Sequence, residues 1–403
     1  MLARRFDLTT KVFGTILGVA RTANWLLALN GFQNLAWAPR AVPGTTVVGR
    51  PRVSVLVPAR DEARNIAACV ESLLSQSFPP DEILVLDDQS TDGTVAIVER
   101  IASAPEAGRL RSLPGSDPPM GWSGKNWACH QLGAAAHGDW LLFTDADTRH
   151  HPDCLAAALD LARRYDADLV SLLPRQRLIT LGERLLLPQL PLIIHTFLPL
   201  CLVPRRERWA IPFAGAFGPY LLFRRSWYER LGGHAAIRDM LGEDMQFAVA
   251  AKRQGGRVVL ADGCAVLDCR MYTGFAEVWR GLTRNAQPAA RGSVVALALF
   301  GLAWALLFVM PPFAALALVM RQVRDRRRAE GALTRLALVA TGGQLALRLA
   351  IGQRHGWPCR DVALQPLGAC LLLGVLVDSW YRHRIGAVTW RSRRCGDRVA
   401  VGR

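Results

Sequence analysis

The chain has 403 residues, of which 51% are hydrophobic, so it can form a large core and more than one domain. Its formal net charge is +16, and arginine supplies nearly all of the positive charge. Arginine blocks flank apolar stretches and no aromatic-basic motif occurs, which argues against nucleic-acid binding and favours contact with a membrane. The nine cysteines show no metal-binding spacing, as expected in a reducing compartment. The arginine blocks are Arg205–Arg206, Arg326–Arg328 and Arg391–Arg394.

Residues 11–37 form the first apolar stretch, which polar residues such as Arg21 and Asn24 interrupt. No cleavable signal peptide is evident, and the stretch predicts either a membrane-spanning helix or a helix lying in the membrane interface. Residues 39–51 are rich in Gly, Pro and Thr, as expected for a linker. We therefore assign residues 1–50 to an N-terminal membrane or interfacial segment followed by a linker.

Short apolar runs then alternate with helical patterns. Runs at residues 53–57, 83–86 and 141–144 predict buried strands. The first helix is expected to begin at Asp61, with acidic residues in its first turn, and to end near Gln76. The β-α-β-α-β alternation predicts an α/β domain over residues 51–290, with a mostly parallel sheet and helices on both faces. Further expected elements are helices at 95–102, 125–136, 153–165 and 245–254, strands at 168–173 and 213–223, and a loop at 105–124.

One uncharged segment of this domain, residues 185–203, does not fit a regular element. It contains Pro188, Pro191 and Pro199, which disfavour a regular helix. Arginines flank it on both sides, which indicates a segment at the membrane interface. Ordinary core packing broken by prolines is the alternative.

The C-terminal third contains the most apolar stretches. Residues 293–320 carry no charge and predict a membrane-spanning helix that Pro311–Pro312 kinks or splits. Residues 336–351 and 362–381 are further candidate spans. We therefore assign residues 291–403 to transmembrane helices followed by a basic tail. The positive-inside rule predicts that this tail is cytoplasmic. The expected protein is a multi-pass protein of the cell membrane with its α/β domain in the cytoplasm, and the number of spans stays open.

Two carboxylates one residue apart, Asp145 and Asp147, follow the run at 141–144. At the carboxyl end of a parallel strand they would lie where open α/β sheets bind ligands. In a tight turn such carboxylates converge, and they repel one another unless a proton or a cation lies between them. Oxygen ligands of this kind favour Mg²⁺ or Mn²⁺ shared with substrate phosphates. The structural alternative is that Asp147 or Thr148 caps the helix expected after Pro152.

Four acidic motifs occur in order, most of them at the ends of expected strands. They are VPARDEARNI at 57–66, VLDDQSTDGT at 85–94, FTDADT at 143–148 and GEDMQFA at 242–248. Together they resemble the family 2 glycosyltransferases, which have the GT-A nucleotide-sugar fold, over roughly residues 52–290. The stretches at 121–132 and 223–233 are also similar to that family. The tail GAVTWRSRR at 386–394 is similar to membrane members linked to hopanoid and carotenoid glycosylation.

The resemblance implies a nucleotide-sugar donor, a lipid acceptor and a Mg²⁺ or Mn²⁺ ion, and it leaves protein partners open. Asp244 would be the catalytic base that removes the proton of an acceptor hydroxyl. Asp147 would bind the metal, and Asp145 would hold the ribose or a water of the metal shell. The implied donor-binding set is Pro58, Arg60, Asp61, Glu62, Asp88, Lys125 and Asp145, with Gly232, Gly233 and Glu243 on the acceptor side and Arg280 and Arg284 at the diphosphate.

These residues also have structural interpretations. Asp61, Glu62 and Asp244 could each complement a helix dipole, and Asp92 is expected to cap a turn. Lys125 precedes a helix in a loop, as a diphosphate contact would. A solvated lysine is the alternative.

One motif departs from the family. Many processive and ceramide-type members carry Gln-x-x-Arg-Trp before the membrane helices, whereas this chain has Glu277 and Arg280 with no Trp after the Arg. This argues against a polymer synthase. The resemblance therefore implies inverting transfer of a single sugar, expected from a UDP-sugar, to a hydroxyl of a lipid or isoprenoid acceptor that enters along residues 185–203. The open alternatives are transfer to a polyprenyl phosphate and a non-catalytic membrane scaffold with a degenerate GT-A fold.

Overall fold

The computed structural model describes residues 2–240, 242–290, 292–325, 331–385, 389–390 and 393–394, and no side chain before Lys11, at Asp325 or after Ile385. The arginine blocks at 326–328 and 391–394 and the tail motif therefore lie outside the described side chains. The chain forms an α/β unit and a helical unit, and the division into residues 1–50, 51–290 and 291–403 stays a prediction. The α/β unit is Ala38–Arg177, Leu200–Met271 and Ile385–Arg403, and the helical unit is Met1–Trp37, Leu178–Pro199 and Tyr272–Arg384.

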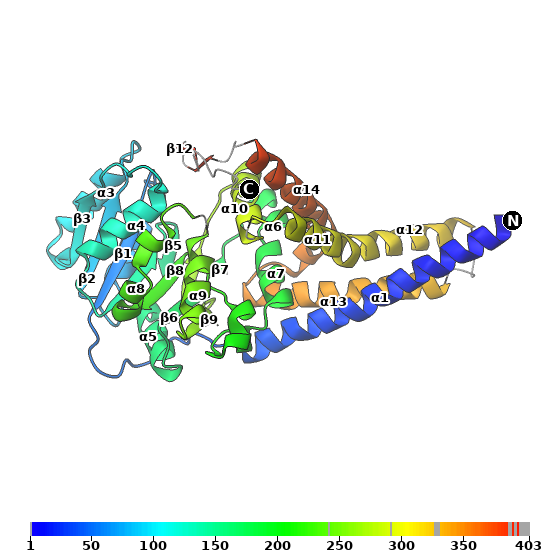
Figure 1. The fold of residues 1–403 in the computed structure, drawn as a ribbon, viewed down its shortest axis with the longest axis horizontal. Helices are drawn as coiled ribbons and strands as arrows, with labels where there is room; N and C mark the ends of the chain where they lie inside the picture. Colours follow the sequence, from blue (N-terminus) through cyan, green and yellow to red (C-terminus); the bar gives the residue numbers. More distant parts are fainter. Residues whose placement is uncertain are drawn as a thin grey trace. The chain divides into compact units, whose positions relative to one another are not determined.

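A seven-stranded mixed sheet forms the centre of the α/β unit (Figure 1). Its strands are β1 (Val53–Ala59), β2 (Glu82–Asp87), β3 (Leu110–Pro114), β4 (Trp140–Thr144), β6 (Leu169–Leu173), β8 (Tyr220–Arg224) and β9 (Val258–Asp262). Their order is β3-β2-β1-β4-β8-β6-β9. All neighbours pair in parallel except β8, which is antiparallel to both β4 and β6. The expected mostly parallel sheet is confirmed.

Helices cover both faces of this sheet because its strands are apolar on both faces. On one face Val55 and Leu142 pack with Val70 and Leu161 in a single buried cluster. On the other face aromatic rings pack edge to face or tilted, including Phe143 against Phe223 and Tyr228, and Phe223 against Phe247. The helices are α2 (Ile66–Leu74), α3 (Thr94–Ala102), α4 (Gly124–Ala135), α5 (Cys154–Arg164), α8 (Arg225–Arg230) and α9 (Glu243–Arg253), with 3₁₀ turns η1 (Pro105–Ala107), η2 (Leu200–Leu202), η3 (Arg208–Phe213) and η4 (Gly233–Ile237).

A small second sheet lies next to the acidic turn. It has the order β5-β10-β7, formed by β5 (Thr148–His150), β10 (Leu267–Cys269) and β7 (Arg175–Gln176). β10 pairs antiparallel with β5 and parallel with β7. A short pair, β11 (Thr389–Trp390) and β12 (Arg393–Arg394), lies near the chain end.

Three predictions about the α/β unit are wrong. The first helix begins at Ile66 rather than at Asp61, because Asp61 has a left-handed backbone (φ 51°) that a helix cannot contain. Residues 105–124 are not a simple loop, since Leu110–Pro114 forms the edge strand β3 beside β2. The strand expected at 213–223 is limited to Tyr220–Arg224, because the residues before it form the 3₁₀ turn η3 and a loop.

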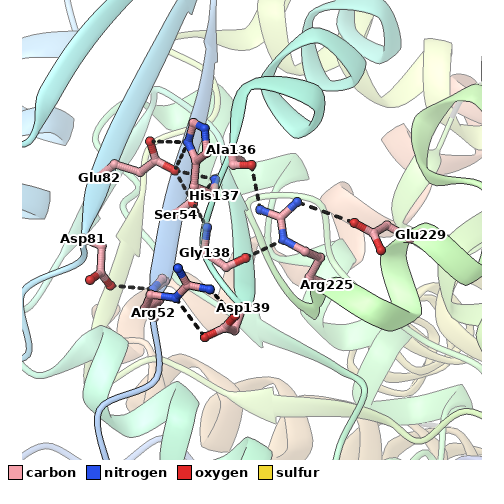
Figure 2. A network of polar contacts seen from close by, with 11 residues as sticks. Arg52, Ser54, Asp81, Glu82, Ala136, His137, Gly138, Asp139, Arg225 and Glu229 are labelled. Carbon is pink, nitrogen blue, oxygen red and sulfur yellow. Dashed lines mark hydrogen bonds and ion pairs between the residues drawn. The ribbon is translucent and has the colours of Figure 1, made fainter.

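A polar network ties together the amino ends of three parallel strands (Figure 2). Ser54 Oγ donates to Glu82 Oε1 at 2.6 Å and accepts the backbone N–H of Gly138 at 2.7 Å. Arg225 donates to the carbonyls of Gly138 and Ala136 at 2.6 and 2.7 Å. These residues flank the starts of β1, β2 and β4, so the network fixes the edge opposite to the acidic turns.

The helical unit contains α1 (Leu2–Trp37), α6 (Leu181–Leu186), α7 (Gln189–Phe197), α10 (Phe275–Ala289), α11 (Val294–Trp304), the π-helical turn η5 (Ala305–Val309), α12 (Met310–Asp325), α13 (Gly331–Arg354), η6 (Cys359–Leu364) and α14 (Gln365–Arg384). Among the described residues, three helices are long and apolar enough to cross a membrane, and they are Lys11–Trp37, Val294–Arg324 and Cys359–Arg384. The candidate span at 336–351 is not among them. It lies on α13, which packs along α1 with Thr, Gln and Arg on its buried face (Figure 1).

The proline pair Pro311–Pro312 does not split its helix, which is one of the two predicted outcomes, but a π-helical turn precedes the pair. A proline lacks the N–H that would bond the carbonyl four residues earlier, which for Pro311 is that of Leu307. The chain forms the π-helical turn η5 just before the prolines and continues through them as α12. The Leu307 carbonyl accepts a hydrogen bond from Asn24 Nδ2 of α1 at 2.8 Å instead. A side chain from a neighbouring helix thus satisfies the group that proline leaves free.

Residues 185–203 form α6, α7 and η2, which meet at prolines as the composition indicated. Leu186, Leu187 and Leu192 are completely buried in the core of the helical unit, against residues such as Trp304 and Leu372. The alternative of core packing is therefore correct for these leucines. An apolar entrance lined by Leu192 is wrong, because its side chain has no exposed surface.

Candidate active site

The turn after β4 brings Asp145 and Asp147 to the carboxyl edge of the sheet. Thr148 at the start of β5 holds the turn, since its Oγ1 donates to the Asp145 carbonyl at 2.7 Å. Asp147 Oδ1 accepts a weak S–H hydrogen bond from Cys269 at 3.6 Å. Burial, followed by the charges of Asp145 and Glu62, raises the pKa of Asp147 to about 7. The turn is therefore a half-buried site of concentrated negative charge.

Lys125 joins this turn to the start of α9. Its Nζ lies 2.8 Å from Asp145 Oδ1 and 2.6 Å from Glu243 Oε1. Burial by itself lowers the pKa of Lys125, but the two carboxylates outweigh burial and raise that pKa well above its usual value. The same ammonium group holds the pKa of Glu243 below its usual value against the opposing effect of burial. Lys125 is thus a permanent cation inside the site and not a solvated surface lysine.

Asp244 lies next to this cluster, in the first turn of α9. Its Oδ2 accepts the backbone N–H of Gly218 at 2.9 Å, and its Oδ1 accepts that of Met245 at 2.8 Å. Burial, followed by the charge of Glu243, raises the pKa of Asp244 to about 7. A carboxylate that titrates near neutral pH and is held by two hydrogen bonds is suited to removing a proton.

Gly218 is a residue of the site that the sequence did not single out. A Cβ atom there would lie 3.5 Å from Glu243 Oε1, 3.6 Å from Asp244 Oδ2 and 3.9 Å from Lys125 Nζ. Gly218 therefore faces the same space as all three charged groups. Its only sequence signal is its position in the Gly-containing stretch before β8.

Asn126 is a second residue that sequence reasoning missed, and it positions Lys125. Ser123 Oγ caps α4 by accepting the N–H of Asn126 at 3.2 Å. The Asn126 side chain is buried and donates to the carbonyls of Ile237 and Met240 at 2.7 and 3.0 Å. These bonds attach the start of α4 to the segment that leads into α9. The burial of Asn126 could not be inferred from its neighbours in sequence.

The residues expected around the nucleotide lie at the ends of β1 and β2. Arg60 Nη1 donates to the Asp88 carbonyl at 2.7 Å and lies 3.5 Å from Asp88 Oδ2. Asp61 Oδ1 accepts the N–H of Thr91 at 2.8 Å, so it braces the loop after β2. The helix-dipole interpretation of Asp61 and Glu62 is wrong, because both precede α2 and its first turn contains no acidic residue.

Three further positions in the α/β unit have defined local contacts. Pro58 lies in β1, opposite Leu86 of β2. Glu62 Oε2 accepts a hydrogen bond from Asn65 at 3.0 Å. Asp92 caps its turn as predicted, since its Oδ1 accepts the Thr94 N–H at 3.1 Å. A donor-binding role for Pro58 and Glu62 stays a prediction.

The remaining predicted positions are Gly232 and Gly233 in the α/β unit and Arg280 and Arg284 in the helical unit. Gly232 and Gly233 form a turn with φ of 80° and 53°, and a Cβ at Gly233 would lie 2.9 Å from the Tyr228 ring. Glycine is required there for backbone and packing reasons. Arg280 and Arg284 lie on α10 of the helical unit. Their roles at the acceptor and the diphosphate stay predictions.

Asp145 and Asp147 fit a divalent ion that is shared with a substrate. Among the described residues, no group of three or more His, Cys, Asp or Glu side chains is arranged to hold a metal by itself. Mg²⁺ usually takes only one or two carboxylates from the protein and completes its shell with water and phosphate oxygens. Burial, and then the charges of Asp145 and Glu62, raise the pKa of Asp147, and a bound cation would compensate this negative charge.

The mixed sheet, its flanking helices and the acidic turn at its carboxyl edge define the GT-A fold. Residues 54–232 match the model of the family described as glycosyl transferase family 2. These residues are a family 2 glycosyltransferase domain, as the motifs implied.

The similar proteins include two named glycosyltransferases and one solved mannosyltransferase. The chain is 25% identical over 358 residues to 4,4'-diaponeurosporenoate glycosyltransferase of Staphylococcus aureus strain MRSA252, covering 85% of this chain and 88% of the relative. It is 26% identical over 363 residues to the enzyme of strain USA300, with the same coverage. A solved mannosyltransferase of Pyrobaculum calidifontis, in complex with GDP-Man and Mn²⁺, superimposes with a TM-score of 0.54 at 20% identity over 93% of this chain and 98% of its own. The last similarity establishes the fold.

Proposed function

We propose that this glycosyltransferase moves one sugar, with inversion, from a nucleotide-diphosphate sugar, expected to be a UDP-sugar, to a hydroxyl of a lipid or isoprenoid acceptor. Asp244 is the observation that carries the proposal. It is a carboxylate with a pKa of about 7, fixed by two backbone N–H groups and adjacent to the cation Lys125. A hydroxyl acceptor needs such a base, because its proton must leave as the new bond forms.

Asp145 and Asp147 would hold a Mg²⁺ or Mn²⁺ ion, which supplies positive charge to the departing diphosphate when bound. Lys125 adds a fixed positive charge at the same place, because Asp145 and Glu243 keep it protonated. Arg60 and Asp88 would form the wall of the nucleotide pocket, since their mutual contacts fix both side chains. These parts together would favour departure of the nucleoside diphosphate.

The expected acceptor is apolar. The two Staphylococcus aureus relatives are named for 4,4'-diaponeurosporenoate. The described part of this chain has three helices long enough and apolar enough to cross a membrane. Both observations support an isoprenoid acceptor that reaches the enzyme from the bilayer. They also support a multi-pass protein of the cell membrane, with the α/β unit on the cytoplasmic side where nucleotide sugars occur.

The name of these relatives denotes a carboxylate acceptor. This favours a second possibility, transfer to an acceptor that is already anionic, either a carboxylate or a polyprenyl phosphate. An acceptor that is already anionic needs no strong base. The experiment is therefore Asp244→Asn, with Asp239→Asn in the exposed loop before α9 as the control. Purified full-length protein is supplied with UDP-sugars and alcohol, carboxylate or phosphate isoprenoids, and the products are measured by mass spectrometry.

For a hydroxyl acceptor, Asp244→Asn should lower kcat by roughly a thousandfold or more, with donor binding retained. Asp239→Asn should retain full activity. If Asp244→Asn leaves transfer to a carboxylate or phosphate intact, the hydroxyl proposal is wrong and the anionic acceptor is correct. If wild-type protein transfers no sugar to any of these lipids, the lipid-acceptor proposal itself fails.

A further inference from the structure

A charged side chain is buried in the core of the helical unit without a counter-ion. Arg348 of α13 is 2% exposed, its Nε has no hydrogen-bond partner, and no carboxylate among the described residues forms an ion pair with it. Gln344, one helical turn earlier, is also 2% exposed, and neither its Oε1 nor its Nε2 has a partner. Residues four apart lie on the same helix face. Two adjacent polar side chains thus share one unsatisfied region.

The guanidinium of Arg348 is held in a defined place. It lies over the Trp357 ring, 4.8 Å from the ring centre. Gly352 gives it room, because a Cβ there would lie 3.1 Å from Arg348 Nη1. The Trp357 N–H donates to the Gly352 carbonyl at 2.8 Å, and His355 stacks on Trp357 with ring centres 4.4 Å apart. Trp357, in the turn after α13, therefore positions the arginine by stacking against the flat face of its guanidinium. The edge of the guanidinium is left available for hydrogen bonds.

The acidic residue in this region is already used. Asp361 is 1% exposed and forms a two-pronged ion pair with Arg184, whose Nε lies 2.7 Å from Asp361 Oδ2 and whose Nη2 contacts Asp361 Oδ1. Asp361 attracts Arg348 only over a longer distance. Among the described residues, Asp361 is thus paired with Arg184, and Arg348 has no carboxylate of its own. Ionisable groups buried among apolar helices are costly and usually mark a binding site.

We propose that Arg348 and Gln344 bind the acidic headgroup of an amphiphile, a carboxylate or a phosphate. A guanidinium edge and an amide N–H₂ are both donors, and they match the acceptor oxygens of such a group. The neighbouring core is apolar, with Leu347, Ile351 and Ala28 buried around them, so the ligand carries a hydrocarbon tail. Two sources supply this chemistry, a carboxylic lipid substrate and an anionic phospholipid. This proposal concerns binding alone, and it does not depend on which acceptor the enzyme glycosylates.

Binding is tested on the purified full-length protein in detergent by native mass spectrometry, without any sugar donor. The carboxylate probe is retinoate, a polyene acid, with methyl retinoate as its neutral counterpart. The phosphate probe is phosphatidylglycerol, with phosphatidylcholine as the lipid of zero net charge. The wild-type protein should retain at least one acidic probe about tenfold better than its uncharged partner. Preference for retinoate assigns the site to a carboxylic lipid, and preference for phosphatidylglycerol assigns it to a phospholipid.

Three variants locate the binding. Arg348→Gln should abolish the preference, and Arg335→Gln, which removes the same charge from an exposed position on the same helix, should keep it. Gln344→Glu places a carboxylate one turn before Arg348, where it forms an internal ion pair. This variant should lose the acidic probe and keep or raise its Tm, so it decides the question even if Arg348→Gln fails to fold. The proposal is overturned if Gln344→Glu binds acidic probes like wild type, if Arg335→Gln loses them equally, or if wild type shows no preference.

Discussion

The Nζ of Lys125 lies 2.6 Å from Oε1 of Glu243, and this ion pair connects the amino ends of two helices that are distant in sequence. A lysine in the first turn of a helix is unfavourable, because the helix dipole places positive charge there. Lys125 occupies that position in α4 only because Glu243 and Asp145 surround it. Sequences break local rules of this kind mostly where a functional site requires it.

Removing the lysine should change how the base titrates. The charge of Lys125 lowers the pKa of Asp244, against the larger effects of burial and Glu243 that raise it to about 7. Lys125→Met should therefore raise that pKa further. Because the base acts only when deprotonated, the pH at which kcat/KM reaches half its maximum should move upward, and activity at pH 7 should fall about a hundredfold. Initial rates between pH 5.5 and 9 measure both effects.

Lys125→Arg is the matched variant, since it keeps the positive charge. It should retain the wild-type pH profile with a smaller loss in rate. A Lys125→Met enzyme with an unchanged pH profile would show that Lys125 does not influence the base.

The metal hypothesis makes a prediction about both activity and stability. Asp147→Asn removes a carboxylate whose pKa burial, Asp145 and Glu62 raise, so like-charge repulsion decreases. The Asn oxygen can still accept the S–H of Cys269. The variant should therefore keep or raise its Tm while losing transfer activity by about a hundredfold or more. Tm is measured with chelator present, so that metal binding does not enter the comparison.

Wild-type protein should lose activity in excess chelator and regain it with Mg²⁺ or Mn²⁺. Full activity of the wild type in chelator would exclude a metal role for Asp147.

Asn24 should stabilise the helical unit. Its Nδ2 donates to the Leu307 carbonyl at 2.8 Å and to the Ala340 carbonyl at 3.0 Å, so it joins three segments. Asn24→Leu should lower the free energy of unfolding by about 1–2 kcal/mol. Pro311 has no N–H to donate to the Leu307 carbonyl, so the variant leaves that carbonyl without a donor. Thermal unfolding in detergent measures the change. Thr15→Val, which removes only a hydroxyl bonded within α1 and partly exposed, should have little effect, and equal losses in both variants would contradict the assignment.

Acid should destabilise the α/β unit through buried His234. The ring lies 2.9 Å from Tyr228 Oη, and burial lowers the pKa of His234 to about 3. In the unfolded chain that pKa is about 6.5. Between pH 6.5 and 3 the unfolded chain binds a proton that the folded chain does not, so stability is complete above pH 6.5 and falls as the pH decreases. At pH 5 the loss from this residue is about 2 kcal/mol.

The fall in Tm between pH 7 and pH 5 should therefore be smaller for His234→Gln than for wild type. His137→Gln, at an exposed position, should show the full wild-type fall. An equal fall in wild type and His234→Gln would mean that His234 takes up a proton without unfolding.

The sequence by itself determined the parallel strands β1, β2 and β4, the acidic turn and the family. Val53–Val57 and Leu141–Thr144 are apolar runs that end in acidic or Pro-containing turns, and such local patterns indicate strand ends directly. The sequence also located three apolar helices long enough to cross a membrane, from their length and composition, and it wrongly added residues 336–351. It placed the start of α2 wrongly, since the left-handed backbone of Asp61 depends on the loop that Asp61 braces after β2.

Only the tertiary structure decided which residues act together. The contacts of Lys125 with Asp145 and Glu243, of Gly218 with Asp244, and of Asn24 with Leu307 all join segments far apart in the chain. No local propensity encodes such contacts, because they arise when the sheet order and the helix packing bring distant segments together. The same reason explains Leu192 and Arg348. Whether an apolar residue lines an entrance or fills a core, and whether an arginine is solvated or buried, depends on the neighbours that the complete fold supplies.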